Sequence, residues 1–159
     1  MKIGIIKEGK TPPDKRVALT PSHCAHLKQT YPELEIKVQR SPIRCFADEE
    51  YAAAGIELVD SVNDCDVIFG VKEVKYEMLA EGKTMLFFSH TIKKQPYNRA
   101  LLQEILKKKV RLIDYETLTY SNGFRVLGFG RYAGIVGAYN ALIAHGKRYG
   151  TFEMKPANL

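Results

Sequence analysis

The feature of this sequence that most constrains its fold is a repeated alternation of short apolar runs with longer helical segments. The apolar runs are rich in Val, Ile, Leu and Phe and are continuous, which is typical of parallel strands that are buried on both faces. These runs predict strands at residues 2–5, 35–38, 66–70, 84–88, 110–113 and 124–129.

Helical segments lie between the predicted strands, at residues 22–29, 48–54, 97–108 and 131–149. Thr20 and Pro21 supply a cap and a proline at the start of the first of these helices. Gly55 stops the second. Alternating strands and helices predict an α/β fold: a mostly parallel central sheet flanked by helices, Rossmann-like or flavodoxin-like with three layers, that ends in a long helix.

Charge and apolar content limit the classes of partner. The chain has 24 Lys and Arg against 18 Asp and Glu, a formal net charge of +6, which fits either a lysine-rich surface or a basic cleft for a small anionic substrate. The basic residues are scattered and form no recognition motif, so we expect no nucleic-acid partner. No apolar run approaches the ~20 residues of a membrane-spanning helix, so we expect no membrane partner.

The N-terminus and the cysteines predict a cytoplasmic location. The sequence MKIGIIKEGK becomes charged too early for a signal peptide. The three cysteines are widely spaced and include no CxxC pair, which favours free thiols in a reducing compartment.

Polar residues follow the predicted strands at the edge where α/β folds place their chemistry: Lys7 and Arg16, Lys72, His90, and Asp114 with Glu116. Lys72 comes after the strand at 66–70, where a lysine can serve as a general base. His90 comes after the strand at 84–88, and an imidazole transfers protons near neutral pH. The alternatives are a surface lysine paired with Glu73 and a histidine that is hydrogen-bonded at a strand end.

Three further residues are weighed from their surroundings. Arg16 lies in a proline- and lysine-rich loop, where its guanidinium could bind a carboxylate or be solvated. His23 and His26 share a helix face, but no further Cys or His pair lies at ligand spacing. We therefore predict no metal site.

The stretch VLGFGRYAGIVGAYN, residues 126–140, resembles a phosphate-binding loop between a strand and a helix. Such a loop requires an acidic residue about 20 positions later, at the end of a second strand. The residues before Glu153 do not predict a strand. We therefore expect Gly128 and Gly130 to allow a turn beside a cleft, and Gly134 and Gly137 to let the long helix pack closely against a neighbouring domain.

Several stretches together resemble one family, the alanine dehydrogenase and transhydrogenase N-terminal domains. MKIGIIKE followed by RVALTP matches the start of that family. The stretches LTPSHC, FSHT with Gln95, LIDYE, FGRYAG and HGKRY are similar, more narrowly, to lysine–2-oxoglutarate reductase and to lysine-forming saccharopine dehydrogenase. The resemblance runs from residue 1 to about 150.

The resemblance implies a reaction and a set of site residues. Such enzymes condense the ε-amine of L-lysine with 2-oxoglutarate and reduce the imine to saccharopine with NADH or NADPH, or run the reverse reaction. The residues that match are, for acid–base catalysis, Lys72 and His90; for substrate binding, Arg16, Lys72, Gln95, Arg125 and Phe129; and for the nicotinamide side of the cofactor, Arg125 and Phe129.

Family members also carry a nucleotide-binding Rossmann domain, to which the long helix would lead. We therefore expect residues 1–130 to form the substrate-binding domain and 131–159 an interdomain helix and tail. NAD or NADP would be held mainly by the further domain, and this chain alone is expected to be inactive. The alternatives are an alanine dehydrogenase-like domain, which uses pyruvate and ammonia, and a non-catalytic binding or regulatory module.

Overall fold

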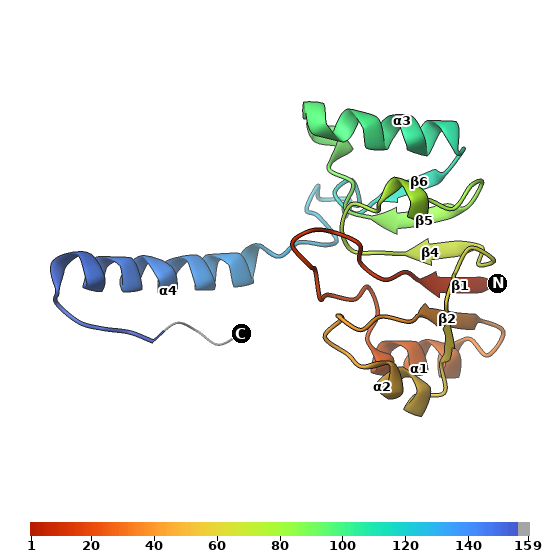
Figure 1. The fold of residues 1–159 in the computed structure, drawn as a ribbon, viewed down its shortest axis with the longest axis horizontal. Helices are drawn as coiled ribbons and strands as arrows, with labels where there is room; N and C mark the ends of the chain where they lie inside the picture. Colours follow the sequence, from red (N-terminus) through yellow and green to blue (C-terminus); the bar gives the residue numbers. More distant parts are fainter. Residues whose placement is uncertain (156–159) are drawn as a thin grey trace.

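The apolar runs of the N-terminal part form a six-stranded sheet in the computed structural model, which describes residues 1–155 (Figure 1). The strands are β1 (Lys2–Ile5), β2 (Glu35–Gln39), β3 (Glu57–Val59), β4 (Val67–Phe69), β5 (Thr84–Phe87) and β6 (Arg111–Asp114). Their order is β3-β2-β1-β4-β5-β6, and neighbouring strands pair in parallel. The predicted mostly parallel α/β fold is confirmed.

Helices alternate with these strands along the chain. They are α1 (Pro21–Thr30), α2 (Asp48–Ala53), α3 (Arg99–Lys107) and α4 (Gly130–Tyr149), with the short 3-10 turns η1 (Tyr76–Met78), η2 (Thr91–Lys93) and η3 (Pro96–Asn98). Thr20 caps α1, because its side-chain oxygen accepts a hydrogen bond from the backbone N–H of His23 at 3.2 Å.

Two apolar clusters, one on each face of the sheet, hold these layers together. On one face, Ile5 and Val38 of the sheet pack with Cys24 of α1 and Tyr51 of α2. On the other face, Ile68, Met85 and Phe87 pack with Leu101 and Ile105 of α3. The sheet is therefore covered on both sides, which explains the continuous apolar runs of β4 and β5.

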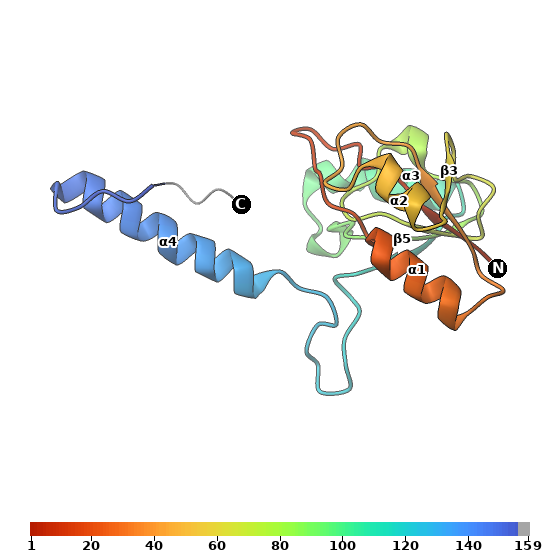
Figure 2. The same ribbon diagram turned by 90° about the horizontal axis from the view of Figure 1, so that it is seen from below.

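The predicted strand at residues 124–129 is wrong. That segment makes only an isolated antiparallel bridge, between Thr119 and Arg125, and runs as an exposed loop between β6 and α4 (Figure 2). Its apolar side chains find no neighbouring strand and stay exposed, with Phe124 at 73% and Phe129 at 53%. The sequence also failed to predict β3, whose three residues are too few to give a pattern.

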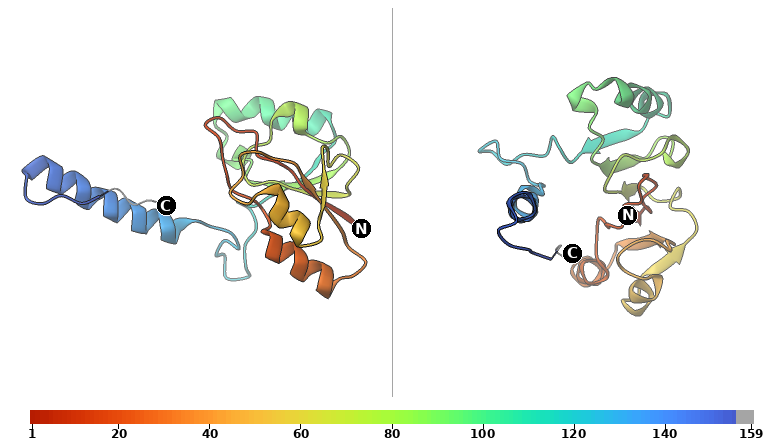
Figure 3. Two further views of the ribbon diagram at one scale, coloured as in Figure 1. Left: turned by 60° about the horizontal axis from the view of Figure 1, so that its bottom comes forward. Right: turned by 60° about the vertical axis from the view of Figure 1, so that its left-hand side comes forward.

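Helix α4 extends away from the sheet (Figures 1 and 3) and buries only Gly146 among its residues. A Cβ atom on Gly134 or Gly137 would meet no atom within 4 Å, so the predicted close packing is not made by the described residues. Gly128 does line a cavity, as expected, but neither Gly128 nor Gly130 has a positive φ, so the turn there does not require glycine. Residues 156–159 of the predicted tail lie outside the described residues.

Within residues 1–155, none of the helices is both long and apolar enough to cross a membrane.

Candidate active site

The polar groups predicted at the strand ends lie near the boundary between β1 and β4. At this boundary the order of the strands reverses: β2 and β3 lie on one side of β1, and β4, β5 and β6 lie on the other. The chain leaves β1 towards α1 on one face and leaves β4 towards the opposite face, and a crevice lined by Val71, Phe88 and Tyr115 opens at the carboxyl ends of the strands. Four strands deliver side chains there: Glu8 follows β1, Lys72 follows β4, His90 follows β5 and Glu116 follows β6.

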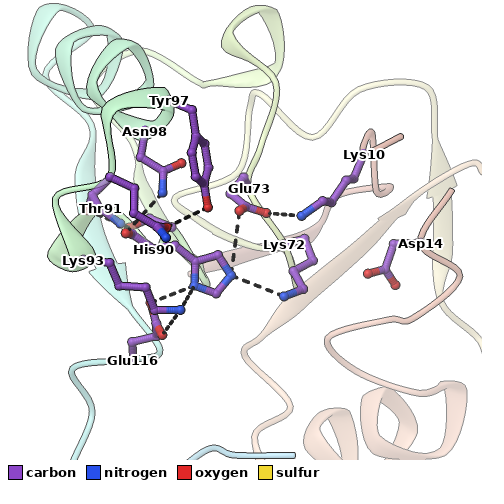
Figure 4. Close-up of polar contacts among 12 residues, drawn as sticks. Lys10, Asp14, Lys72, Glu73, His90, Thr91, Lys93, Tyr97, Asn98 and Glu116 are labelled. Carbon is purple, nitrogen blue, oxygen red and sulfur yellow. Dashed lines mark hydrogen bonds and ion pairs between the residues drawn. The ribbon is translucent and has the colours of Figure 1, made fainter. Parts of the chain in front are cut away.

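Lys72 and His90 are in direct contact (Figure 4). Lys72 Nζ lies 3.3 Å from His90 Nε2, and the side chain of His90 is only 15% exposed. Two groups that can each hold a proton, at hydrogen-bond distance and partly shielded from water, form an acid–base pair.

Glu116 fixes the other side of the imidazole. Its carboxylate oxygen Oε2 lies 2.8 Å from His90 Nδ1, and its side chain is 3% exposed. Burial opposes ionisation of Glu116, but hydrogen bonds from His90 and Lys93 outweigh it, so its pKa lies below the usual range. His90 Nδ1 has two neighbours: the Glu116 carboxylate at 2.8 Å, which only accepts, and Lys93 Nζ at 3.1 Å, which only donates. The shorter contact is with the acceptor, and Lys93 also pairs with Glu116 Oε1 at 3.2 Å. This geometry favours a proton on Nδ1, which turns the Nε2 lone pair towards Lys72 Nζ.

Glu73 and Lys10 form an ion pair beside this acid–base pair. Lys10 Nζ lies 2.9 Å from Glu73 Oε2, and the other oxygen of Glu73 lies 3.7 Å from His90 Nε2. Burial raises the pKa of Glu73, but the hydrogen bond from Lys10 and the nearby positive charges lower it overall. Glu73 thus pairs with Lys10 and faces His90, whereas the alternative drawn from the sequence paired it with Lys72.

Glu8 holds the backbone at the end of β4. Its two carboxylate oxygens accept hydrogen bonds from the N–H groups of Val71 and Lys72, at 2.8 and 2.9 Å. Burial raises the pKa of Glu8, against the effect of these two hydrogen bonds. The carboxylate crosses from β1 to β4 and so sets the position from which Lys72 projects.

Arg16 and Phe129 lie side by side at an apolar cavity of about 330 Å³. The Arg16 guanidinium lies 5.2 Å from the centre of the Phe129 ring, and its Nε donates to Asp14 at 2.9 Å. The hydrogen bond with Arg16 lowers the pKa of Asp14. Phe88 forms a further wall, with ring centres 5.9 Å from Phe129 and 5.1 Å from Tyr115. This cavity suits an aliphatic chain or a flat ring next to a carboxylate.

The two remaining predicted residues differ in their placement. Arg125 reaches the acid–base pair, because its Nη1 lies 3.7 Å from Glu116 Oε1. Gln95 is exposed, and its side-chain oxygen accepts a hydrogen bond from the Tyr97 hydroxyl at 2.8 Å. The structure thus brings together Lys72, His90 and Arg125 in one network and Arg16 with Phe129 beside the cavity, and leaves Gln95 on the surface.

Three acidic residues complete the site, and the sequence assigned none of them a role. Glu8, Glu73 and Glu116 each touch the acid–base pair or its backbone. The available signal was the position of Glu116 after the β6 run, opposite the His90 loop. Residues 1–155 contain no group of three or more His, Cys, Asp or Glu side chains placed to hold a metal ion.

The fold and this site define a doubly wound α/β domain with an acid–base lysine–histidine pair at its topological switch point. The chain belongs to the family described as "Alanine dehydrogenase/PNT, N-terminal domain", which matches residues 4–136. It is therefore a domain of an oxidoreductase family.

Its relatives include two kinds of enzyme of lysine metabolism. The chain is 39% identical over 150 residues to "Alpha-aminoadipic semialdehyde synthase" of Arabidopsis thaliana, covering 92% of this chain and 14% of that protein. It is 35% identical over 135 residues to "Saccharopine dehydrogenase [NAD(+), L-lysine-forming]" of Neurospora crassa, covering 81% and 36% respectively.

The solved structure of an L-alanine dehydrogenase has the same fold, with a TM-score of 0.64 at 24% identity over 78% of this chain and 35% of that one. The chain thus spans between about a seventh and about a third of the length of these proteins.

Proposed function

We propose that this chain is the substrate-binding domain of an NAD(P)-dependent oxidoreductase that forms or cleaves saccharopine. The observation that carries the proposal is the contact of 3.3 Å between Lys72 Nζ and His90 Nε2 at the switch point, oriented by Glu116. The relatives that are named for saccharopine and aminoadipic semialdehyde support this substrate class.

The proposed reaction needs two separate proton transfers. Attack of the lysine ε-amine on the keto carbon of 2-oxoglutarate requires a neutral amine, so one group takes a proton from the substrate ammonium. The carbinolamine then loses its hydroxyl as water, which requires a proton on that oxygen. Lys72 and His90 can share these tasks because a proton can pass between Nζ and Nε2. Glu116 stabilises the imidazolium that forms when His90 holds the proton.

The charges of the crevice fit the proposed product, which carries three carboxylates. Arg16 and Arg125 can bind carboxylates through paired N–H groups, and Lys10 and Lys93 add positive charge. Arg16 already binds Asp14, so a substrate carboxylate would share or replace that contact. Gln95 would join the substrate only if η2 and η3 moved towards it.

The nicotinamide cofactor supplies or accepts the hydride when it is bound. The exposed Phe129 ring, Phe88 and the apolar cavity between them fit a flat nicotinamide, and Arg125 lies at the same edge. We propose these residues as the border of the cofactor site. The phosphate-binding part of that site would belong to a further domain, for which the longer relatives have room in the rest of their sequence.

The proposal is tested in the longest protein that contains this chain, with Lys72→Met and His90→Gln. We expect each variant to lower kcat/KM for lysine and 2-oxoglutarate by about 10²–10⁴-fold, the usual contribution of a general acid or base. Lys107→Met is the matched control, because Lys107 is 75% exposed and pairs with Glu104 on α3. Unchanged turnover in both site variants would remove the pair from the mechanism.

The second candidate is alanine dehydrogenase chemistry, which a relative named "Alanine dehydrogenase", 33% identical over 130 residues, favours. Pyruvate and ammonia would then replace the larger substrates, with the same acid–base pair. Turnover with pyruvate and ammonia alone would overturn the saccharopine proposal. Absence of turnover with either substrate pair would favour a binding or regulatory module.

A further inference from the structure

One buried carboxylate contacts both chain segments that meet at the imidazole of His90. Asp114, the last residue of β6, is 7% exposed. One of its oxygens accepts a hydrogen bond from the hydroxyl of Ser89, and the other accepts one from the backbone N–H of Glu116 at 2.9 Å. Ser89 is fully buried and directly precedes His90. Asp114 therefore links the residue before His90 with the backbone of its hydrogen-bond partner.

The backbone at His90 needs such a support. Its φ is 57°, in the left-handed region, which costs free energy for any residue other than glycine and persists only where neighbours enforce it. The Ser89 hydroxyl accepts the Thr91 N–H at 3.1 Å, and the buried Asn98 amide donates to the His90 carbonyl at 3.2 Å. The hydrogen bonds on either side of His90 thus hold the turn. The Ser89 hydroxyl that accepts the Thr91 N–H is itself fixed by its hydrogen bond to Asp114.

We propose that Asp114 is a positioning residue that holds His90 and Glu116 in register and thereby selects the His90 tautomer. The contact between Nδ1 and Glu116 Oε2 is 2.8 Å, a distance that both backbones must maintain. If Asp114 releases Ser89 and Glu116, that contact loosens and the ring proton redistributes between Nδ1 and Nε2. Nε2 then no longer presents its lone pair to Lys72 in every molecule.

This role depends on two hydrogen bonds rather than on the charge of Asp114. An asparagine at this position can accept the Glu116 N–H through its oxygen and donate to the Ser89 oxygen through its nitrogen. The Ser89 hydroxyl then donates to Thr91 Oγ1, which lies 2.7 Å away. Asp114→Asn therefore keeps both links, whereas Asp114→Ala removes both.

The test is the ¹⁵N–¹H spectrum of the His90 imidazole in this chain, assigned with His90→Gln and recorded at a pH where the ring is neutral. In the unmodified chain and in Asp114→Asn, we expect one protonated nitrogen, Nδ1, and one well-separated unprotonated nitrogen, Nε2. In Asp114→Ala, we expect the two shifts to converge as the tautomers exchange. The catalytic meaning of the tautomer rests on the proposed function, but this measurement requires no turnover.

The controls separate positioning from general stability. Val62→Ala opens a cavity in the core next to Gly4, away from Asp114, and should leave the His90 shifts unchanged. If Asp114→Ala does not fold, Ser89→Ala breaks one link alone and should produce the same convergence. Unchanged His90 shifts in a folded Asp114→Ala or in Ser89→Ala overturn the proposal. A convergence in Asp114→Asn or in Val62→Ala overturns it as well.

Discussion

At the scale of single residues, the site depends on one nearly inaccessible carboxylate that faces an imidazole and two cations. Glu116 lies within 4 Å of His90, Lys93 and Arg125, and its side chain is 3% exposed. Its ionised form is stabilised by folding, because its pKa in the folded chain lies below the ordinary 4.5. Glu116 thus contributes stability above about pH 4.5, and this contribution is lost as the pH falls through the lowered pKa.

Glu116→Gln cannot titrate, so its stability should depend less on acid. We expect the free energy of unfolding to fall less between about pH 6 and about pH 3 in this variant than in the unmodified chain. Urea denaturation at each pH measures the difference. Glu77→Gln, at an exposed position of η1, should keep the original pH dependence. Parallel pH profiles for Glu116→Gln and the unmodified chain would contradict the assignment.

At the scale of elements, the N-cap residue Thr20 fixes the first turn of α1. The Thr20 side chain accepts the His23 N–H, which is otherwise without a partner in the helix. Thr20→Ala should lower the free energy of unfolding by about 1 kcal/mol, the usual cost of losing such a cap. Thr20→Ser keeps the hydroxyl and should recover most of it. Equal stability of the two variants in urea denaturation would show that the cap contributes nothing.

The elements also show what a sequence can predict. Continuous apolar runs identified β1, β2, β4, β5 and β6, because strands covered on both faces leave that pattern. The run at 124–129 has the same composition but no strand beside it, and pairing is not encoded in a single segment. The positions of Lys72 and His90 after strands made them candidates, and the resemblance to the family supplied their expected roles. The contacts of Glu73 and Glu116 with His90 depend on how β4, β5 and β6 lie next to one another.

At the scale of the whole molecule, the site is open to solvent on one side, because no element within residues 1–155 packs over it. Helix α4 leaves the sheet directly after Phe129, and its side chains Tyr132, Ile135 and Leu142 are more than half exposed. The relatives are several times longer than this chain. If the site binds substrate and a hydride donor as proposed, it does so without excluding water, because only one side of the site is built by these residues.

The isolated 159-residue chain should therefore bind substrate weakly and show no NADH or NADPH oxidation. The measurement is the absorbance of the reduced cofactor in the presence of lysine and 2-oxoglutarate at increasing concentrations. The longest protein that contains the chain, assayed in the same way, is the positive control. Saturable oxidation by the isolated chain would refute this expectation.

The arrangement of strands and loops has a consequence for how such a domain can be altered. The strands and helices carry most of the core, whereas Lys72, His90 and the charged groups around them lie on the loops that follow β1, β4, β5 and β6. The crevice itself comes from the order of the strands, not from any one side chain. The same scaffold can therefore accept new loop sequences and a different substrate without a new core, so libraries built on this domain should vary the loops and leave the strands unchanged.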